Sequence, residues 1–191
     1  MSAGSGRPVR RHPSYWRSQP RSRRQWGWHC LGPEWAQRVV DASAVGAGDL
    51  VLDVGAGTGA LTAPLVAAGA RVVAVELNPE RAASLKERFG DAVTVVRADL
   101  RDLRLPRRPF RVVASPPYSA SADLLRLLMS TDRLLSADLV LQRAVARRLM
   151  AAPPSRRHTR RYVFELGMPV PRRAFSPPPQ VDSVVLRVRR R

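Results

Sequence analysis

A glycine-rich run early in the chain has the composition of a ligand-binding turn. In Leu52-Asp-Val-Gly-Ala-Gly-Thr-Gly59, Gly55, Gly57 and Gly59 follow an apolar, strand-like segment. A residue without Cβ adopts positive φ easily and lets the backbone approach a ligand closely. Because Gly55, Gly57 and Ala60 also fit the pattern of nicotinamide-binding folds, the glycines alone do not identify the cofactor.

Three carboxylates at the ends of predicted strands favour S-adenosylmethionine. Asp53 lies just before the first glycine, where it can face the amino-acid end of this cofactor. Glu76 ends the next strand, and its two oxygens can accept hydrogen bonds from both ribose hydroxyls. Asp99 follows the third strand and can accept one from the adenine amino group. Open α/β sheets bind ligands at these strand ends, so we also place the following residues, Leu77 and Leu100, in this pocket.

A second motif, Ser115-Pro-Pro-Tyr118, suits chemistry on a nucleobase. The lone pair of an adenine amino group is delocalised into the ring and must be localised before it attacks a methyl sulfonium. We expect the Ser115 side chain and the Pro116 carbonyl to hold the two N–H bonds while the nitrogen pyramidalises. Tyr118 can stack on the extruded base, a contact worth about 1–3 kcal/mol. The sulfonium charge drives this step, so the predicted catalytic set is these three residues, without a metal.

The charge of the chain indicates a nucleic-acid partner. The sequence has 33 basic and 15 acidic residues, a net charge of +18 and an isoelectric point near 11.8. Lys86 is the only lysine, and the planar guanidinium of arginine suits phosphates and stacked bases. A GC-rich genome would explain arginine in place of lysine but not the excess over acids. The arginines predicted to contact RNA are Arg21, Arg23, Arg24, Arg156, Arg157, Arg160 and Arg161.

The sequence divides into a basic arm and one folded domain. Residues 1–28 contain arginine and tryptophan but no acid, which is typical of an arm that stays flexible until it binds a polyanion. Residues 29–191 suffice for a single domain with its own core. Cys30 is the only cysteine, so no intrachain disulfide forms. Because no signal-peptide pattern and no membrane-length apolar run is found, we expect a cytoplasmic protein.

Strand-like and helix-like segments alternate along this domain. The predicted strands are 50–54, 71–76, 92–97, 110–115, 138–142, 162–166 and 182–188. The predicted helices are 33–43, 59–68, 79–89, 120–130 and 143–152, and Pro64 should shorten or bend the second. The stretch 153–173 is predicted as a loop around its one strand. Short apolar strands separated by helices predict an α/β fold with a mostly parallel seven-stranded sheet and helices on both faces.

These motifs together resemble the ribosomal RNA adenine N6-methyltransferase family, which includes the Erm resistance methylases and the 16S rRNA dimethyladenosine transferases. The resemblance covers about residues 26–188 and consists of Trp26-Gly-Trp-His-Cys-Leu31, Leu52–Gly59, Glu76-Leu-Asn-Pro79, Ala98-Asp-Leu100, Ser115–Tyr118, Val140–Leu149 and Phe175–Ser183. It implies a Rossmann-like class I S-adenosylmethionine-dependent methyltransferase fold. It also implies a cofactor pocket lined by His29, Leu31, Gly55, Glu76, Asp99 and Ser115.

The chain departs from the family pattern in four respects. Trp28 and Cys30 replace a usual glutamine and phenylalanine, and Ala144 replaces a usual glutamate. Ser115 replaces an asparagine, whose side chain reaches further toward the target amino group. The small helical domain that usually follows the Val-Asp-Ser strand is expected to be absent. We therefore expect the basic arm and the 153–173 loop to grip RNA in its place.

The leading prediction is an Erm-like enzyme that methylates the N6 amino group of an adenosine in 23S rRNA, as free RNA or in a pre-50S particle. Its product would confer resistance to macrolides, lincosamides and streptogramin B. The alternative within the family is a 16S rRNA adenine dimethyltransferase. A non-catalytic RNA-binding protein with the same fold and a nicotinamide oxidoreductase are the alternatives outside it. We expect the protein to act as a monomer.

Overall fold

A mixed sheet organises the described part of the chain. The computed structural model describes residues 29–153 and 160–191, so the predicted arm, Arg156 and Arg157 lie outside it. Seven strands lie in the order β4-β3-β2-β5-β6-β9-β7. Their bounds are β2 (Leu50–Val54), β3 (Arg71–Val75), β4 (Val93–Val96), β5 (Phe110–Ala114), β6 (Leu134–Gln142), β7 (Tyr162–Val170) and β9 (Ser183–Arg190). Of these, β9 alone runs opposite to the other six, which confirms the predicted mostly parallel seven-stranded sheet.

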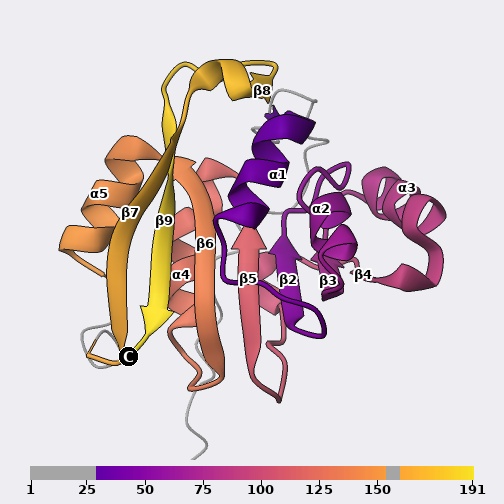
Figure 1. Cartoon of the computed structure of the whole chain (residues 1–191), viewed down its shortest axis with the longest axis horizontal. Coiled ribbons are helices and arrows are strands. Elements are labelled where there is room, and N and C mark those ends of the chain that lie inside the picture. The colour runs from indigo at the N-terminus through magenta and orange to yellow at the C-terminus, as the bar shows by residue number, and fades with distance from the viewer. Residues whose placement is uncertain (1–28, 154–159) are drawn as a thin grey trace, which may run out of the picture.

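Helices cover both faces of this sheet, as predicted (Figure 1). One face carries α1 (Pro33–Asp41), α2 (Thr62–Ala67) and α3 (Pro79–Phe89), and the other carries α4 (Ser121–Leu128) and α5 (Arg143–Ala151). The buried apolar side chains form two clusters, one on each side. Val112 and Val113 of β5 contribute to different clusters, because successive strand residues point to opposite faces. Because both faces of the sheet are buried, the strand sequences are continuous apolar runs.

The topology brings the turns after three strands to one edge. β2 pairs in parallel with β3 on one side and with β5 on the other. The chain moves outward from β2 to β3 and β4 and then returns to β5, so the strand order reverses beside β2. Ligands of open α/β sheets bind at such a reversal, outside the carboxyl ends of the strands. This carboxyl edge lies at the top of Figure 1, and the chain ends at the opposite edge.

Local sequence determines where α3 begins and ends. The Asn78 side chain accepts a hydrogen bond from the backbone N–H of Arg81 (3.0 Å), and Pro79 takes the first helical position. Gly90, with φ +52°, ends the helix. Since Glu76 lies just before this cap, the cap also fixes the loop that carries the Glu76 carboxylate.

Several element bounds differ from the predicted ones. β6 begins at Leu134 and β7 continues to Val170, because both strands pair with β9 over nearly their whole length. α2 is shorter than predicted, and its Pro64 lies in the first turn, where a missing N–H costs no helical hydrogen bond. A small sheet of β1 (Cys30–Leu31) and β8 (Phe175–Ser176) has no counterpart among the predicted elements. Strands of two residues are too short to show a periodic pattern in the sequence.

Candidate active site at the carboxyl edge

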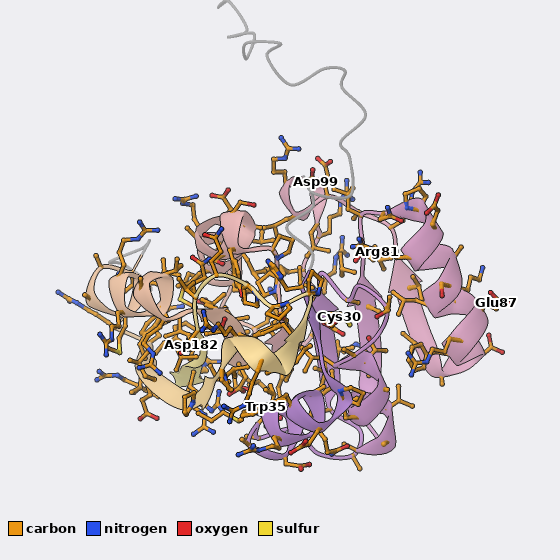
Figure 2. All side chains as sticks on the ribbon, turned by 90° about the horizontal axis from the view of Figure 1, so that it is seen from above. Cys30, Trp35, Arg81, Glu87, Asp99 and Asp182 are labelled. Atoms are coloured by element: carbon orange, nitrogen blue, oxygen red, sulfur yellow. The ribbon has the colours of Figure 1, made fainter. Side chains whose placement is uncertain are left out.

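A cavity of about 290 Å³ lies at the carboxyl edge of the sheet. It joins the glycine turn after β2, the loops after β3 and β4, and the proline loop after β5. The predicted site residues that line it are His29, Leu31, Asp53, Gly55, Gly57, Glu76, Leu77, Asp99, Leu100, Ser115, Pro116 and Tyr118. Figure 2 looks onto this edge and labels Cys30, Arg81 and Asp99, three of the lining residues. The structure therefore places the predicted cofactor and base sites in one cavity.

The glycine turn contacts the proline loop directly. Gly55 has φ +78°, and a Cβ there would lie 3.2 Å from the Pro117 side chain and 3.4 Å from Pro116 Cα. The two turns can approach this closely because position 55 has no side chain. Gly59 does not line the cavity, and a Cβ on it would lie 2.7 Å from the ring of Phe89. Its predicted place in the cofactor pocket is therefore corrected to packing against α3.

Glu76 links the glycine turn after β2 to the loop after β3, on the side of the cavity predicted to hold the cofactor. Its buried carboxylate accepts a hydrogen bond from the Gly57 N–H on Oε2 (2.8 Å) and from the Asn78 N–H on Oε1 (2.8 Å). A carboxylate oxygen has two lone pairs, so each oxygen can also accept a bond from a ligand hydroxyl. This geometry is compatible with the predicted contact to both hydroxyls of a ribose.

Asp53 is a buried carboxyl group that lines the cavity. It is 1% exposed, and its Oδ2 accepts a hydrogen bond from the Thr62 hydroxyl (2.7 Å). Burial raises the pKa of Asp53 to about 7; the Thr62 hydrogen bond lowers this pKa and the charge of Glu76 raises it, both by smaller amounts. A cation in the cavity would stabilise the ionised form of Asp53. The site is thus suited to the ammonium group at the amino-acid end of S-adenosylmethionine.

Asp99 is engaged by an arginine that the sequence analysis did not single out. Arg101 donates from Nε to Oδ1 (3.0 Å) and from Nη2 to Oδ2 (2.6 Å), and its backbone N–H donates to Oδ1 (3.0 Å). The Arg101 side chain is 73% exposed and lines the cavity. A ligand amino group that uses Asp99 must therefore share the carboxylate with this guanidinium or displace it.

The proline loop holds Tyr118 at the wall of the cavity. Tyr118 begins a 3₁₀ helix, η4 (Tyr118–Ala120), directly after the prolines. Its hydroxyl lies 3.1 Å from Ser183 Oγ, and its carbonyl accepts a hydrogen bond from the Ser121 hydroxyl (3.0 Å). The ring of His29 packs on the Tyr118 ring, with centroids 5.9 Å apart and planes inclined by 28°. Burial raises the pKa of the Tyr118 hydroxyl, so it remains protonated at neutral pH.

Several lining residues have no counterpart among the predicted site residues. They include Cys30, Thr58, Arg81, Arg101, Asp123 and Phe175. Phe175 opens one of the segments that carry the family resemblance, which is a usable sequence signal. Arg81 and Asp123 lie on α3 and α4, and only the packing of these helices shows that they reach the cavity.

Two of the predicted RNA contacts lie far from the cavity. Arg160 and Arg161 precede β7, which runs parallel to β6 because both are antiparallel to β9. They therefore lie at the amino edge of the sheet, where Arg161 forms an ion pair with Asp132. β7 occupies Tyr162–Val170 of the stretch 153–173 and extends beyond the predicted strand 162–166. The contact of these two arginines with RNA stays a prediction. The remaining predicted contacts, Arg21, Arg23, Arg24, Arg156 and Arg157, lie outside the described residues.

Within residues 29–153 and 160–191, no group of three or more His, Cys, Asp or Glu side chains is arranged to hold a metal ion. In the same ranges, no helix has the length and apolar composition that crossing a membrane requires.

The chain matches the family model of Ribosomal RNA adenine dimethylase over residues 21–191. It is 36% identical over 163 residues to Ribosomal RNA small subunit methyltransferase A of Cupriavidus taiwanensis. This alignment covers 78% of the chain and 59% of that protein. It is also 36% identical to the protein of the same name from Thermosynechococcus vestitus, over 88% of the chain and 70% of that protein. The chain thus spans little more than half the length of the Cupriavidus relative.

Solved structures show the same architecture. The 23S rRNA methyltransferase ErmE superposes with a TM-score of 0.77 at 29% identity, over 85% of this chain and 70% of that one. A dimethyladenosine transferase from Plasmodium falciparum gives a TM-score of 0.73 at 26% identity, over 85% of this chain and 64% of that one. The predicted Rossmann-like class I methyltransferase fold is confirmed by these similarities.

Proposed function

The chain belongs to the ribosomal RNA adenine dimethylase family, and on that basis we propose that it transfers methyl groups from S-adenosylmethionine to the N6 amino group of an adenosine in ribosomal RNA. The observation that carries this proposal is the shared cavity, in which the glycine turn and the proline–tyrosine loop touch at Gly55. Family membership also sets aside the nicotinamide oxidoreductase hypothesis.

The residues present fit the cofactor that the family implies. Glu76 offers a carboxylate that is already oriented by two backbone N–H groups, which suits a ribose diol. Asp53 offers a buried carboxyl whose ionised form a cation would stabilise. S-adenosylmethionine supplies, when bound, an electrophilic methyl group on a positively charged sulfur. Leu31, Leu77 and Leu100 give the cavity apolar wall, which limits access of water to such a group.

The proline loop would orient the target amino group. Ser115 and Pro116 line the same cavity, so a hydroxyl and a backbone carbonyl are available to accept the two N–H bonds of an adenine amino group. Holding both N–H bonds out of the ring plane localises the nitrogen lone pair and directs it toward the methyl donor. Tyr118 would stack on the base and keep it at this position.

We propose small-subunit ribosomal RNA as the first candidate substrate. The curated relatives from Cupriavidus and Thermosynechococcus, and a third from Methanopyrus kandleri at 36% identity, are all named as small-subunit methyltransferases. These names favour a 16S rRNA adenine dimethyltransferase over the leading prediction of a 23S enzyme. 23S rRNA, with antibiotic resistance as its consequence, remains the second candidate because of the similarity to ErmE.

We further propose that RNA contacts the protein along α5 and the 3₁₀ helix η5 (Arg172–Ala174). Arg143 opens α5 at the carboxyl end of β6, and Arg172 and Arg173 follow the carboxyl end of β7, so all three lie at the edge that holds the cavity. Arg147 lies one turn further along α5. All four residues are exposed, and none of their guanidinium groups forms an ion pair among the described residues. Unpaired guanidinium groups are suited to phosphates.

The basic arm 1–28 would add contacts to RNA, and a ribosomal substrate would place the protein in the cytoplasm. Action as a monomer and recognition of a pre-ribosomal particle are likewise proposed.

Incubation of the purified protein with tritiated S-adenosylmethionine tests the function. The substrates are 16S rRNA, 23S rRNA, and the two ribosomal subunits, each extracted from a host that lacks this class of methylation. We expect label in adenosine of one rRNA, with dimethyladenosine identified by nucleoside analysis and the position mapped by primer extension. Label confined to 16S rRNA would support the first candidate, and label confined to 23S rRNA would replace it by the second. No label in any rRNA would overturn the enzyme proposal and favour a non-catalytic RNA-binding role.

An arginine comparison tests the RNA surface. The double variant R143Q/R147Q should weaken RNA binding and reduce its dependence on salt, because fewer counterions are released. The matched control R160Q/R161Q removes the same charge at the opposite edge and should change RNA affinity less. Equal losses in the two variants would contradict the proposed surface.

A further inference from the structure

We infer that Ser183 and His29 are positioning residues for Tyr118, and that they leave one face of its ring for the target base. The inference rests on the proposed function, since it concerns the ring that would stack on the adenine. It goes beyond that function because it assigns the orientation of this ring to two side chains outside the Ser-Pro-Pro-Tyr motif.

Ser183 lies at the carboxyl edge of the sheet, between β6 and β7. It is fully buried at the start of β9, and its backbone pairs with Gln142 of β6 on one side and Val170 of β7 on the other. Its hydroxyl lies 3.1 Å from the Tyr118 hydroxyl and has no other hydrogen-bond partner among the described residues. Loss of this hydrogen bond would leave a buried hydroxyl without a partner, which costs free energy. The tip of Tyr118 is thus tied to the sheet rather than to its own loop.

His29 fixes the plane of the same ring from the other direction. Its Nδ1 lies 2.7 Å from the carbonyl oxygen of Pro177, and because a carbonyl only accepts, Nδ1 carries the proton. The next residue, Cys30, pairs with Ser176 in the β1–β8 sheet, so the segments on both sides of this hydrogen bond are held together. The imidazole packs on Tyr118 in a stacked arrangement. The imidazole therefore restrains the phenol ring from one side, and the base would stack from the opposite side.

Tyr118 is held at its hydroxyl by Ser183, at its ring by His29 and at its carbonyl by Ser121. A ring that is already oriented loses little conformational freedom when the base arrives. Ser183 is not among the residues that line the cavity. Removal of its hydroxyl should therefore lower turnover on RNA, while cofactor binding, which depends on the glycine turn and Glu76, should persist.

A double-mutant cycle tests the Ser183 anchor. S183A and Y118F each remove one hydroxyl of the pair, and each should lower kcat for methyl transfer about fivefold, the factor that corresponds to one typical net hydrogen bond. The double variant S183A/Y118F should lose no more than either single variant. S183T, which keeps the hydroxyl, should retain most of the activity, and the affinity for S-adenosylmethionine should stay within about twofold throughout. The matched control is S136A, which removes another buried serine hydroxyl, on β6.

Nuclear magnetic resonance supplies a readout that does not require activity. The chain has three tyrosines, and the Tyr118 ring signal of ¹³C-tyrosine-labelled protein is identified by its loss in Y118F. In S183A and in H29A this signal should move toward that of a mobile tyrosine, but not in S136A. Full activity of S183A, independent losses in the double variant, or an unchanged Tyr118 signal in S183A and H29A would overturn the inference. Absence of methyl transfer by the wild-type protein would instead count against the proposed function, and the ring signal would still test the anchors.

Discussion

Replacement of Asp53 by asparagine tests the main electrostatic feature of the cavity. Asparagine keeps an oxygen that can accept the Thr62 hydrogen bond but carries no charge. In the unfolded chain Asp53 has its ordinary pKa of 3.8, whereas in the folded protein burial raises this pKa to about 7. Between these values the folded state binds more protons than the unfolded state, so the contribution of Asp53 to stability falls as the pH rises. Above about pH 7 Asp53 is ionised in both states, so its effect on the free energy of unfolding no longer changes with pH.

The size of this effect follows from the pKa difference. A shift of this size corresponds to roughly 4 kcal/mol of destabilisation once Asp53 is ionised in both states. Part of this destabilisation is already present at pH 5, because the Asp53 carboxyl of the unfolded chain is ionised at that pH. We therefore expect the free energy of unfolding of D53N, relative to the wild type, to increase by roughly 3 kcal/mol between pH 5 and pH 8.

Urea unfolding at half-unit steps from pH 5 to pH 8.5 measures this difference. Other titrating groups contribute to both proteins, so their effects cancel in the comparison. D91N, which removes an exposed carboxylate, controls for the loss of one negative charge. T62V removes the hydrogen bond that lowers the pKa of Asp53 and should shift the pH dependence upward. An increase below about 1 kcal/mol for D53N would refute the conclusion that burial governs this carboxyl.

The same carboxyl couples ligand binding to protons. A bound sulfonium or ammonium group would stabilise the ionised Asp53 and lower its pKa, so binding of S-adenosylmethionine near pH 6.5 should release a fraction of a proton. Calorimetry in buffers of different ionisation enthalpy measures this release, which D53N should abolish. Equal proton release by both proteins would show that another group is responsible.

Three further predictions concern the walls of the cavity. G55A combines positive φ with a Cβ that would lie 3.2 Å from Pro117, and it should lower the free energy of unfolding by about 2 kcal/mol; an unchanged melting temperature would contradict the close contact of the two turns. E76Q places an amide N–H₂ against one of the two backbone N–H donors, so calorimetry should show at least about tenfold weaker binding of S-adenosylmethionine. Y118A should lower kcat on rRNA by about 5–150-fold with little effect on cofactor affinity, and equal activity would exclude a stacking role.

Much of the site was predictable because its parts are local in the sequence. The glycine turn, Glu76 and Asp99 each follow a short apolar strand, and parallel strands deliver such residues to one edge whatever the details of packing. The start of α3 is likewise encoded locally, by an asparagine cap and a proline at the first position.

Other features depend on partners that are distant in the chain. The Arg101–Asp99 pair is local, yet nothing in the sequence shows that its guanidinium lies in the cavity. Gly59 belongs to the glycine motif but faces Phe89 of α3, because the loop turns its residues in different directions. The location of Arg160 and Arg161 depends on the direction of β7, which β9 determines by its insertion between β6 and β7.

The sequence by itself determined the alternation of strands and helices, the basic net charge of the chain and the chemistry of the two motifs, since periodicity, charge and residue type need no partner. Only the tertiary structure decided that Tyr118 is tied to Ser183, that its ring packs on His29, and which edge each arginine occupies. These features are set by strand order and register, which join residues far apart in the chain through contacts that leave no periodic signal along it.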